Sequence, residues 1–131
     1  MIVGMKTVIR CADYARSRAF YSRVMGFAVV EEWEEVQGRG CIFSPGLGLG
    51  PCLEIYQMTE ADRRFQAAFG QPLGNDKVDV QLRTHSVDEW VERLRGQWDF
   101  AGPNDLPWGQ TWIQLRDPDQ LLIAIYQEHR S

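Results

Sequence analysis

Short stretches of alternating apolar and polar residues run through the first half of the chain and are interrupted by one segment with a helical period. Apolar residues recur at helical spacing between Tyr14 and Met25, with Asp13 in place as the N-cap and Gly26 as the stop. The alternating stretches predict strands at Lys6–Cys11, Phe27–Glu32, Arg39–Ser44 and Cys52–Gln57. The first half is therefore predicted to fold as βαβββ.

The second half of the chain repeats this order. A strand is predicted at Val78–Thr84, and Ser86 with Glu89 forms a capping box that opens a helix, which ends at Gly96. Further strands are predicted at Trp98–Ala101, Thr111–Arg116 and Leu121–Gln127, with a tight turn at Asp117–Gln120 between the last two. The second half is again βαβββ, and the predicted fold class is α+β.

The two halves are predicted to be copies of one unit. A shift of about 73 positions lays Lys6 on Asp79 and Asp13 on Ser86, so that strand, cap and helix coincide. Modules of roughly 55 residues are too small to be stable alone, so we expect them to pack together or to exchange between two chains. The predicted parts are a first module (4–58), a linker (59–74) with one helical turn (64–69) and a second module (75–128), within a single domain (1–131).

Composition and charge fit one globular domain and exclude some classes of partner. Of the 131 residues, 44% are hydrophobic and 24% are charged, which is enough apolar surface for a buried core. The net charge of -4 disfavours nucleic acid, and no apolar run approaches the roughly 18 residues of a membrane span. We therefore expect no nucleic-acid and no membrane partner. Since residues 1–6 lack the features of a signal peptide, we expect a cytoplasmic protein.

Two segments carry a resemblance to a known family, Asp13–Phe27 (DYARSRAFYSRVMGF) and Pro107–Ile125 (PWGQTWIQLRDPDQLLIAI). The chain resembles the vicinal oxygen chelate superfamily, which includes glyoxalase I, extradiol dioxygenases, fosfomycin resistance enzymes and bleomycin resistance proteins. The motif PWG at residues 107–109, followed by LRDP at 115–118, is most similar to the bleomycin resistance branch. At Gln120-Leu121 the chain departs from the Gly-Asn that is usual in the family.

The resemblance implies that each module curls its sheet into half of a cup-shaped mixed sheet, and that two chains form a homodimer. One face of each sheet then packs on the helix, and the other faces a ligand. Strand parity suits the helix side at Leu53, Ile55, Val80, Leu82, Ile113, Leu115, Ile123 and Ile125. The opposite parity gives Lys6, Val8, Arg10, Glu54, Tyr56, Asp79, Gln81, Arg83, Trp112, Gln114, Leu122, Ala124 and Tyr126. A sheet face exposed only to water would show the same alternation, so that alternative stays open.

Enzymes of the family, as the resemblance implies, hold a metal ion with His, Gln or Glu at four positions of the cup. The matching positions here are Lys6 (or Thr7, if the alignment shifts by one), Glu54, Asp79 and Ala124. A charged lysine has no lone pair and alanine has no donor atom, so only Glu54 and Asp79 are candidate ligands, both weak. We therefore predict no metal site and no cofactor.

Other reactive side chains do not form a catalytic motif. Cys11, Cys41 and Cys52 include no CxxC pair and no histidine is placed near them in sequence, so we expect apolar fillers. His85, at a strand–helix junction, and His129, in the C-terminal tail, are expected at the surface. No catalytic residue is predicted.

The five tryptophans provide large, flat contact surfaces, and Trp108 in the PWG motif is the first candidate for ligand contact. Trp108 could instead cover the sheet edge, and Trp112 could belong to the core. Trp90 and Trp98 are assigned to packing. Trp33 is placed at a rim, and its role is left undecided. The predicted ligand-binding residues are Trp108, Trp112, Tyr56, Gln114, Tyr126, Glu54, Asp79 and Arg10.

The charge of the ligand depends on whether the carboxylates of Glu54 and Asp79 are already paired. If Lys6, Arg10 or Arg83 neutralises them, a neutral or zwitterionic aromatic ligand is favoured; if not, a planar cation of the bleomycin type fits. The leading hypothesis is a metal-independent protein that sequesters an antibiotic or a planar aromatic metabolite. The alternatives are a divalent-metal-dependent lyase, isomerase or dioxygenase, and a dimerising module whose cup no longer binds a ligand.

Overall fold

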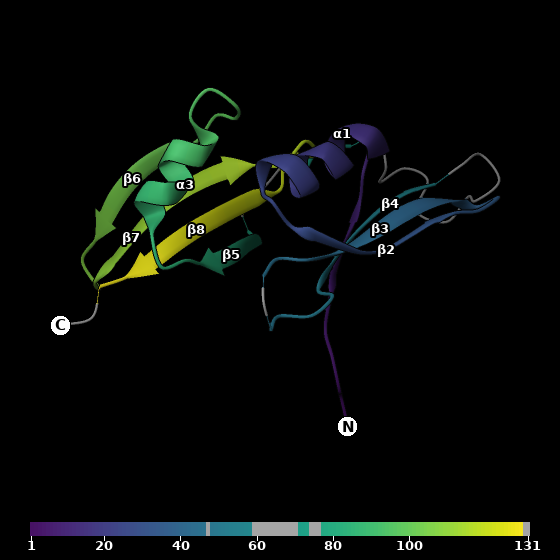
Figure 1. The fold of residues 1–131 in the computed structure, drawn as a ribbon, viewed down its shortest axis with the longest axis horizontal. Helices are drawn as coiled ribbons and strands as arrows, with labels where there is room; N and C mark the ends of the chain where they lie inside the picture. The colour runs from purple at the N-terminus through teal and green to yellow at the C-terminus, as the bar shows by residue number, and fades with distance from the viewer. Residues whose placement is uncertain (47, 59–70, 74–76, 130–131) are drawn as a thin grey trace. The chain divides into compact units, whose positions relative to one another are not determined.

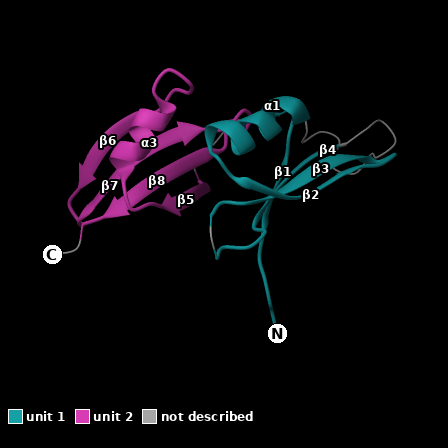
Figure 2. Cartoon of the chain, in the orientation of Figure 1, with its two compact units in different colours: residues 1–71 teal, residues 72–131 magenta. Residues whose placement is uncertain are grey.

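The computed structural model describes residues 1–46, 48–58, 71–73 and 77–129. The chain divides into two units, Met1–Gln71 (unit 1) and Pro72–Ser131 (unit 2) (Figure 2). The helical turn predicted over residues 64–69 lies outside the described residues, and the packing of both modules into a single domain stays a prediction. In the described part of the chain, no helix is long and apolar enough to cross a membrane.

Unit 1 is a four-stranded sheet with one helical segment on one face (Figure 1). The strand order is β1-β4-β3-β2, with β1 parallel to β4 and the other pairs antiparallel. Its elements are β1 (Thr7–Arg10), α1 (Tyr14–Ala19), η1 (Phe20–Val24), β2 (Ala28–Glu34), β3 (Gly38–Ser44) and β4 (Leu53–Met58). The predicted βαβββ order of the first half is confirmed.

Unit 2 repeats this topology, with strand order β5-β8-β7-β6 and helix α3 packed on β7 and β8 (Figure 1). The first strand is again parallel to the last, and the other pairs are antiparallel. Its elements are β5 (Asp79–Arg83), α3 (Val87–Leu94), β6 (Ala101–Leu106), β7 (Gln110–Arg116) and β8 (Leu122–Glu128). Two βαβββ modules of the α+β class are therefore confirmed.

One predicted strand is wrong. Trp98 and the two residues after it precede the strand, and β6 begins at Ala101 and continues through Gly102 and Pro103 to Leu106. A Gly-Pro pair favours a turn, but proline is tolerated in an edge strand, and β6 lies at the edge of its sheet with a register shift between Ala101 and Asn104. Edge position cannot be read from local sequence, which is why the strand was misplaced.

The helical segment of unit 1 is not a uniform α-helix. The predicted helix Tyr14–Met25 consists of α1 followed by the π-helical η1. The hydroxyl of Ser22 donates to the backbone carbonyl of Arg18 at 2.7 Å, and such bonds to the preceding turn bend helices. The N–H of Met25 then donates to the carbonyl of Phe20, five residues back, which is the π-helical pattern.

The same residue types fix both helix starts. Asp13 and Ser86, as predicted, accept a hydrogen bond from the backbone N–H three residues later, each at 3.2 Å. Gln57 at the end of β4 accepts from the first N–H of α1 at 2.8 Å, and Gln127 in β8 accepts from that of α3 at 3.0 Å. Each helix is therefore tied to the last strand of its own unit, which is strong support for a duplication.

The core of each unit lies between the sheet and its helix. In unit 1, Tyr21 packs against Phe20, Phe27 and Phe43 with ring centroids 4.9 to 5.8 Å apart. The residues predicted for the helix side are confirmed as buried at Leu53, Ile55, Ile113, Leu115, Ile123 and Ile125, while Val80 and Leu82 are half-buried. Cys11 and Cys41 are buried and Cys52 is half-buried, all as free thiols.

Candidate functional site

We call the sheet face opposite the helix the open face of each unit. Residues paired across neighbouring strands share a face, so the register assigns every strand residue to one side. Three predicted ligand-binding residues, Arg10, Glu54 and Tyr56, lie on the open face of unit 1. Their neighbours on that face are Val8, Ala28, Glu31, Trp33, Gly38, Gly40, Ile42 and Ser44.

One row across the open face of unit 1 joins two aromatic side chains. Trp33 on β2 pairs with Gly40 on β3, Gly40 pairs with Tyr56 on β4, and Tyr56 pairs with Arg10 on β1. The Tyr56 hydroxyl donates to the carbonyl of Gln37 at 3.1 Å, which fixes the ring. Trp33, undecided from the sequence, is half-buried on this face. The signal that could have placed it is the alternation of Gly38 and Gly40, but using it requires the β2–β3 register.

An ion pair neutralises the carboxylate of Glu54 on the open face of unit 1. The Lys6 ammonium lies 2.6 Å from Oε1 of Glu54, whose side chain is 13% exposed. Partial burial reduces solvent screening of this pair, so we expect it to persist in moderate salt. The sequence left open whether Glu54 would pair with Lys6 or with a cationic ligand, and the structure shows the pair with Lys6.

The open face of unit 2 holds four more of the predicted residues. Trp112 on β7 lies between Asn104 on β6 and Tyr126 on β8, and Tyr126 pairs with Arg83 on β5. The neighbouring row contains Gln114, which pairs with Ala101 and Ala124. Asp79 lies on the same face and accepts a hydrogen bond from Nε2 of Gln81 at 3.2 Å, while Arg83 pairs with Glu128 at 3.6 Å.

Trp108 lies apart from these strand residues, in the turn between β6 and β7. It is 67% exposed, and its indole N–H donates to Oε1 of Gln110 at 2.9 Å. Gln110 is the first residue of β7 and shares the parity of Trp112, so the tryptophan is tethered at the end of the open face. An exposed indole with a fixed orientation is suited to contact a ligand or a partner.

Each open face is close to neutral in formal charge, although the chain carries -4. In unit 1, Lys6 continues the open-face parity of β1, and with Arg10 it balances two carboxylates; unit 2 likewise has two cations and two carboxylates on its strands. The charged residues are Lys6, Arg10, Glu31 and Glu54 in unit 1, and Asp79, Arg83, Arg116 and Glu128 in unit 2. The excess negative charge therefore lies elsewhere on the chain, so the faces themselves do not favour a cation.

The sequence model of one protein family, described as the Glyoxalase/Bleomycin resistance protein/Dioxygenase superfamily, matches residues 5–125. The chain belongs to this superfamily. None of the curated proteins compared with the chain matches it. The superfamily assignment agrees with the resemblance found in the sequence.

Solved structures of superfamily members share the fold. TnmS3, an antibiotic binding protein from Streptomyces sp. CB03234, has a TM-score of 0.72 at 23% identity and covers 98% of both chains. A superfamily member from Sphaerobacter thermophilus DSM 20745 has a TM-score of 0.72 at 21% identity, again over 98% of both chains. Lactoylglutathione lyase from Agrobacterium tumefaciens has a TM-score of 0.65 at 20% identity, over 95% of this chain and 92% of its own. The similar folds therefore include a binding protein and an enzyme.

The four positions that match the metal ligands of the superfamily's enzymes do not fit a metal ion. Lys6 places a cation at 2.6 Å from Glu54, and Ala124 is fully buried and has no donor atom. The described residues contain no group of three or more His, Cys, Asp or Glu side chains that could hold a metal. The donor set therefore does not suit the superfamily's metal chemistry.

A pocket of about 470 Å³ in unit 2 has none of the predicted ligand-binding residues in its lining, although Gln110, which holds the Trp108 indole, is part of it. It is lined by Asp105, Thr111, His129 and the start of α3, among others. The Thr111 hydroxyl donates to Oδ1 of Asp105 at 2.5 Å and lies 2.5 Å from Nε2 of His129, which is exposed as predicted.

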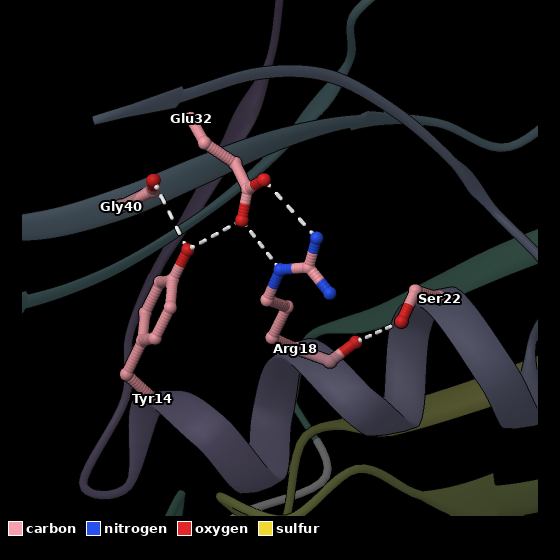
Figure 3. A network of polar contacts seen from close by, with 5 residues as sticks. All are labelled: Tyr14, Arg18, Ser22, Glu32 and Gly40. Atoms are coloured by element: carbon pink, nitrogen blue, oxygen red, sulfur yellow. Dashed lines mark hydrogen bonds and ion pairs between the residues drawn. The ribbon is translucent and has the colours of Figure 1, made fainter.

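A polar network on the helix side of unit 1 ties α1 to the sheet (Figure 3). Glu32 on β2 accepts from the guanidinium of Arg18 at 2.5 and 3.1 Å and from the Tyr14 hydroxyl at 3.3 Å. The Tyr14 hydroxyl also lies 3.2 Å from the carbonyl oxygen of Gly40. Burial raises the pKa of the Cys41 thiol to about 11, so Cys41 is a thiol at neutral pH and not a nucleophile.

Stability is expected to fall between pH 10 and pH 12 because of Tyr14. Burial, with Cys41 and Glu32 nearby, raises the Tyr14 pKa from 10.0 to about 12, so the unfolded chain loses this proton first. The contribution of Tyr14 is complete below pH 10 and is lost as the pH rises to 12, by about 2 kcal/mol. Urea unfolding across this range checks it: the Tyr14→Phe variant should show a shallower decline. If the free energy of unfolding falls equally steeply with pH in wild type and in Tyr14→Phe, the raised pKa of Tyr14 is contradicted.

Proposed function

We propose that this protein binds a planar aromatic small molecule of the antibiotic type and sequesters it without chemical change. The observation that carries the proposal is the row Asn104, Trp112, Tyr126, Arg83 on the open face of unit 2. It combines two aromatic surfaces with hydrogen-bonding groups at both ends. Each ring contact is worth about 0.5–1.5 kcal/mol beyond burial alone.

The charges on the open faces favour a neutral or zwitterionic ligand. Glu54 is already paired with Lys6, so a ligand cation there would have to displace an internal partner, and the carboxylate of Asp79 already accepts a hydrogen bond from the side-chain amide of Gln81. A cation that displaced Lys6 from Glu54 would exchange one ion pair for another, so a positive charge on the ligand gains little binding free energy at this position. Of the two charge types left open by the sequence, the uncharged one is therefore proposed.

The side chains at the family's metal positions favour binding over catalysis, and the comparisons allow both. TnmS3, which has the same fold, is described as an antibiotic binding protein. The fold alone does not decide function, because a lactoylglutathione lyase also shares it. The poor metal donors at Lys6 and Ala124 weigh against the divalent-metal enzyme, and sequestration needs no reacting group. We further propose that the protein is a cytoplasmic homodimer. Light scattering of the purified protein would test the dimer.

Titration of tryptophan fluorescence with bleomycin, mitomycin and neutral polycyclic aromatics tests the proposed function. We expect saturable quenching by at least one neutral aromatic, weakened about fivefold or more by Trp108→Ala because an exposed stacking surface is lost. Elemental analysis of protein purified without chelators is expected to find substoichiometric metal. Near-stoichiometric Zn, Ni, Mn or Fe would favour the enzyme, and no saturable response would favour a dimerising module.

A further inference from the structure

Two glycines on the open face of unit 1 make room for aromatic rings. A Cβ atom at Gly40 would lie 2.3 Å from Cζ2 of Trp33. A Cβ atom at Gly38 would lie 2.7 Å from the hydroxyl oxygen of Tyr56 and 2.5 Å from the backbone oxygen of Gln57, and real Cβ atoms stay at least 3.0 Å from such neighbours. The six-membered ring of Trp33 therefore occupies the space of the missing side chain at Gly40, and the phenol end of Tyr56 shares that at Gly38 with the Gln57 carbonyl. Gly38 and Gly40 are two positions apart in β3, so both gaps open on the same face.

We infer that Trp33 and Tyr56, seated on Gly40 and Gly38, form a stacking platform for a planar, uncharged aromatic group. This inference rests on the proposed function and names the part of unit 1 that would recognise the ligand. Trp33 is not among the ligand-binding residues predicted from the sequence.

The platform is organised before any ligand arrives. The ring of Trp33 is positioned by contact with the backbone of Gly40, and Tyr56 is anchored by the hydrogen bond from its hydroxyl to Gln37. Trp33 nevertheless remains half-buried, so part of its surface is accessible. Rings already held in place lose little conformational entropy on binding, which improves affinity.

The surroundings of the platform favour an uncharged ligand. The next row along the sheet contains Ile42 and Val8, which are apolar, and Glu54, which is paired with Lys6. Glu31 and Arg10 lie at opposite edges of this face and carry opposite charges. A flat apolar group therefore meets rings and aliphatic side chains without having to match a net charge.

An alternative is that Trp33 only stabilises the sheet, since an aromatic residue beside a strand glycine compensates for the missing side chain. The two roles predict different results. A stabilising role lowers the unfolding temperature of Trp33→Ala and leaves the affinity of the folded protein unchanged. A platform lowers the affinity of the folded protein as well, and a flat replacement ring in Trp33→Phe restores most of it.

The test is a fluorescence titration of the full chain with two three-ring probes, neutral lumichrome and cationic proflavine. Wild type is expected to bind lumichrome saturably and more tightly than proflavine, and Trp33→Ala to weaken lumichrome about tenfold. Gly40→Ala should have a similar effect, because its new Cβ displaces the Trp33 ring. Gly46→Ala is the matched control: its Cβ would have Leu49 Cδ1 as nearest neighbour in the described chain, at 3.8 Å, so affinity should stay within about twofold.

The outcomes separate this inference from the proposed function. If wild type binds an antibiotic of the panel but not lumichrome, or binds proflavine more tightly, the uncharged platform is overturned and the binding function stands. If Trp33→Ala binds lumichrome within about twofold of wild type, the platform is overturned in the same way. If wild type binds no probe and no antibiotic, both proposals fail. Should Gly40→Ala not fold, the pair Trp33→Ala and Trp33→Phe decides.

Discussion

Replacing Asp117 with alanine is expected to lower the free energy of unfolding by about 3 kcal/mol. Asp117 lies in the turn between β7 and β8 and is only 1% exposed. Its Oδ1 accepts from the backbone N–H groups of Asp119 at 2.8 Å and Leu121 at 2.9 Å. Alanine would leave two buried donors unpaired, each at a cost of about 1–3 kcal/mol. The Asp117-Pro118 pair of the family motif is therefore a structural element of the turn.

Urea denaturation of wild type, Asp117→Ala and Asp117→Asn would check this value. Asparagine keeps a carbonyl oxygen as acceptor but lacks the charge, so its loss should be about half that of alanine. A loss below about 1 kcal/mol for Asp117→Ala would show that water or the relaxed turn satisfies both N–H groups.

A substitution in the same turn is expected to raise the free energy of unfolding instead of lowering it. Gln120, where the family usually has glycine, adopts a positive φ of 72°, which a side chain disfavours. The turn forms nevertheless, since the Gln120 N–H donates to the carbonyl of Asp117 at 2.9 Å. Gln120→Gly is therefore expected to gain about 0.5–1 kcal/mol, measured by the same denaturation. A destabilised variant would mean that the Gln120 side chain contributes more than its backbone strain costs.

Most of the fold could be predicted because local chemistry and tertiary packing agree. Asp13 and Ser86 mark both helix starts, Gly26 and Gly96 have the positive φ of helix stops, and strand parity matches burial. The misplaced strand β6 and the π-helical η1 depend on information beyond local pattern. A Gly-Pro pair in a strand is acceptable only at a sheet edge, and the turn type of a helix depends on how its side chains bond to the backbone.

The candidate site was less predictable, because parity assigns a face but not a partner. Parity places Lys6 and Glu54 on one face, yet their 2.6 Å ion pair depends on the parallel pairing of two strands more than forty residues apart in sequence. Assigning Trp33 to a face of the sheet requires the β2–β3 register, which shifts between Val29 and Glu31. Counting by alternation across that shift puts Trp33 on the wrong face, and the predicted strand ended at Glu32, one residue before it, whereas β2 continues to Glu34.

Trp112→Ala is expected to weaken the tightest ligand of the antibiotic panel by at least about tenfold. Trp112 is half-buried between Asn104 and Tyr126, in the row that carries the proposed function. Alanine removes one of the two aromatic surfaces of this row, on which a planar ligand would stack. The sequence also allowed Trp112 to be a core residue, and in that case alanine would lower stability without changing the affinity of the folded protein.

Calorimetric titration together with thermal unfolding separates the two roles of Trp112. Trp112→Phe keeps a flat ring and should lose only about two- to threefold in affinity. Trp90→Phe is the matched control: Trp90 lies on α3, with the Arg93 guanidinium carbon 5.7 Å from its ring centroid, and should change neither quantity strongly. If Trp112→Ala and Trp90→Phe bind equally well, Trp112 belongs to packing, and the ligand must be recognised by residues outside this row.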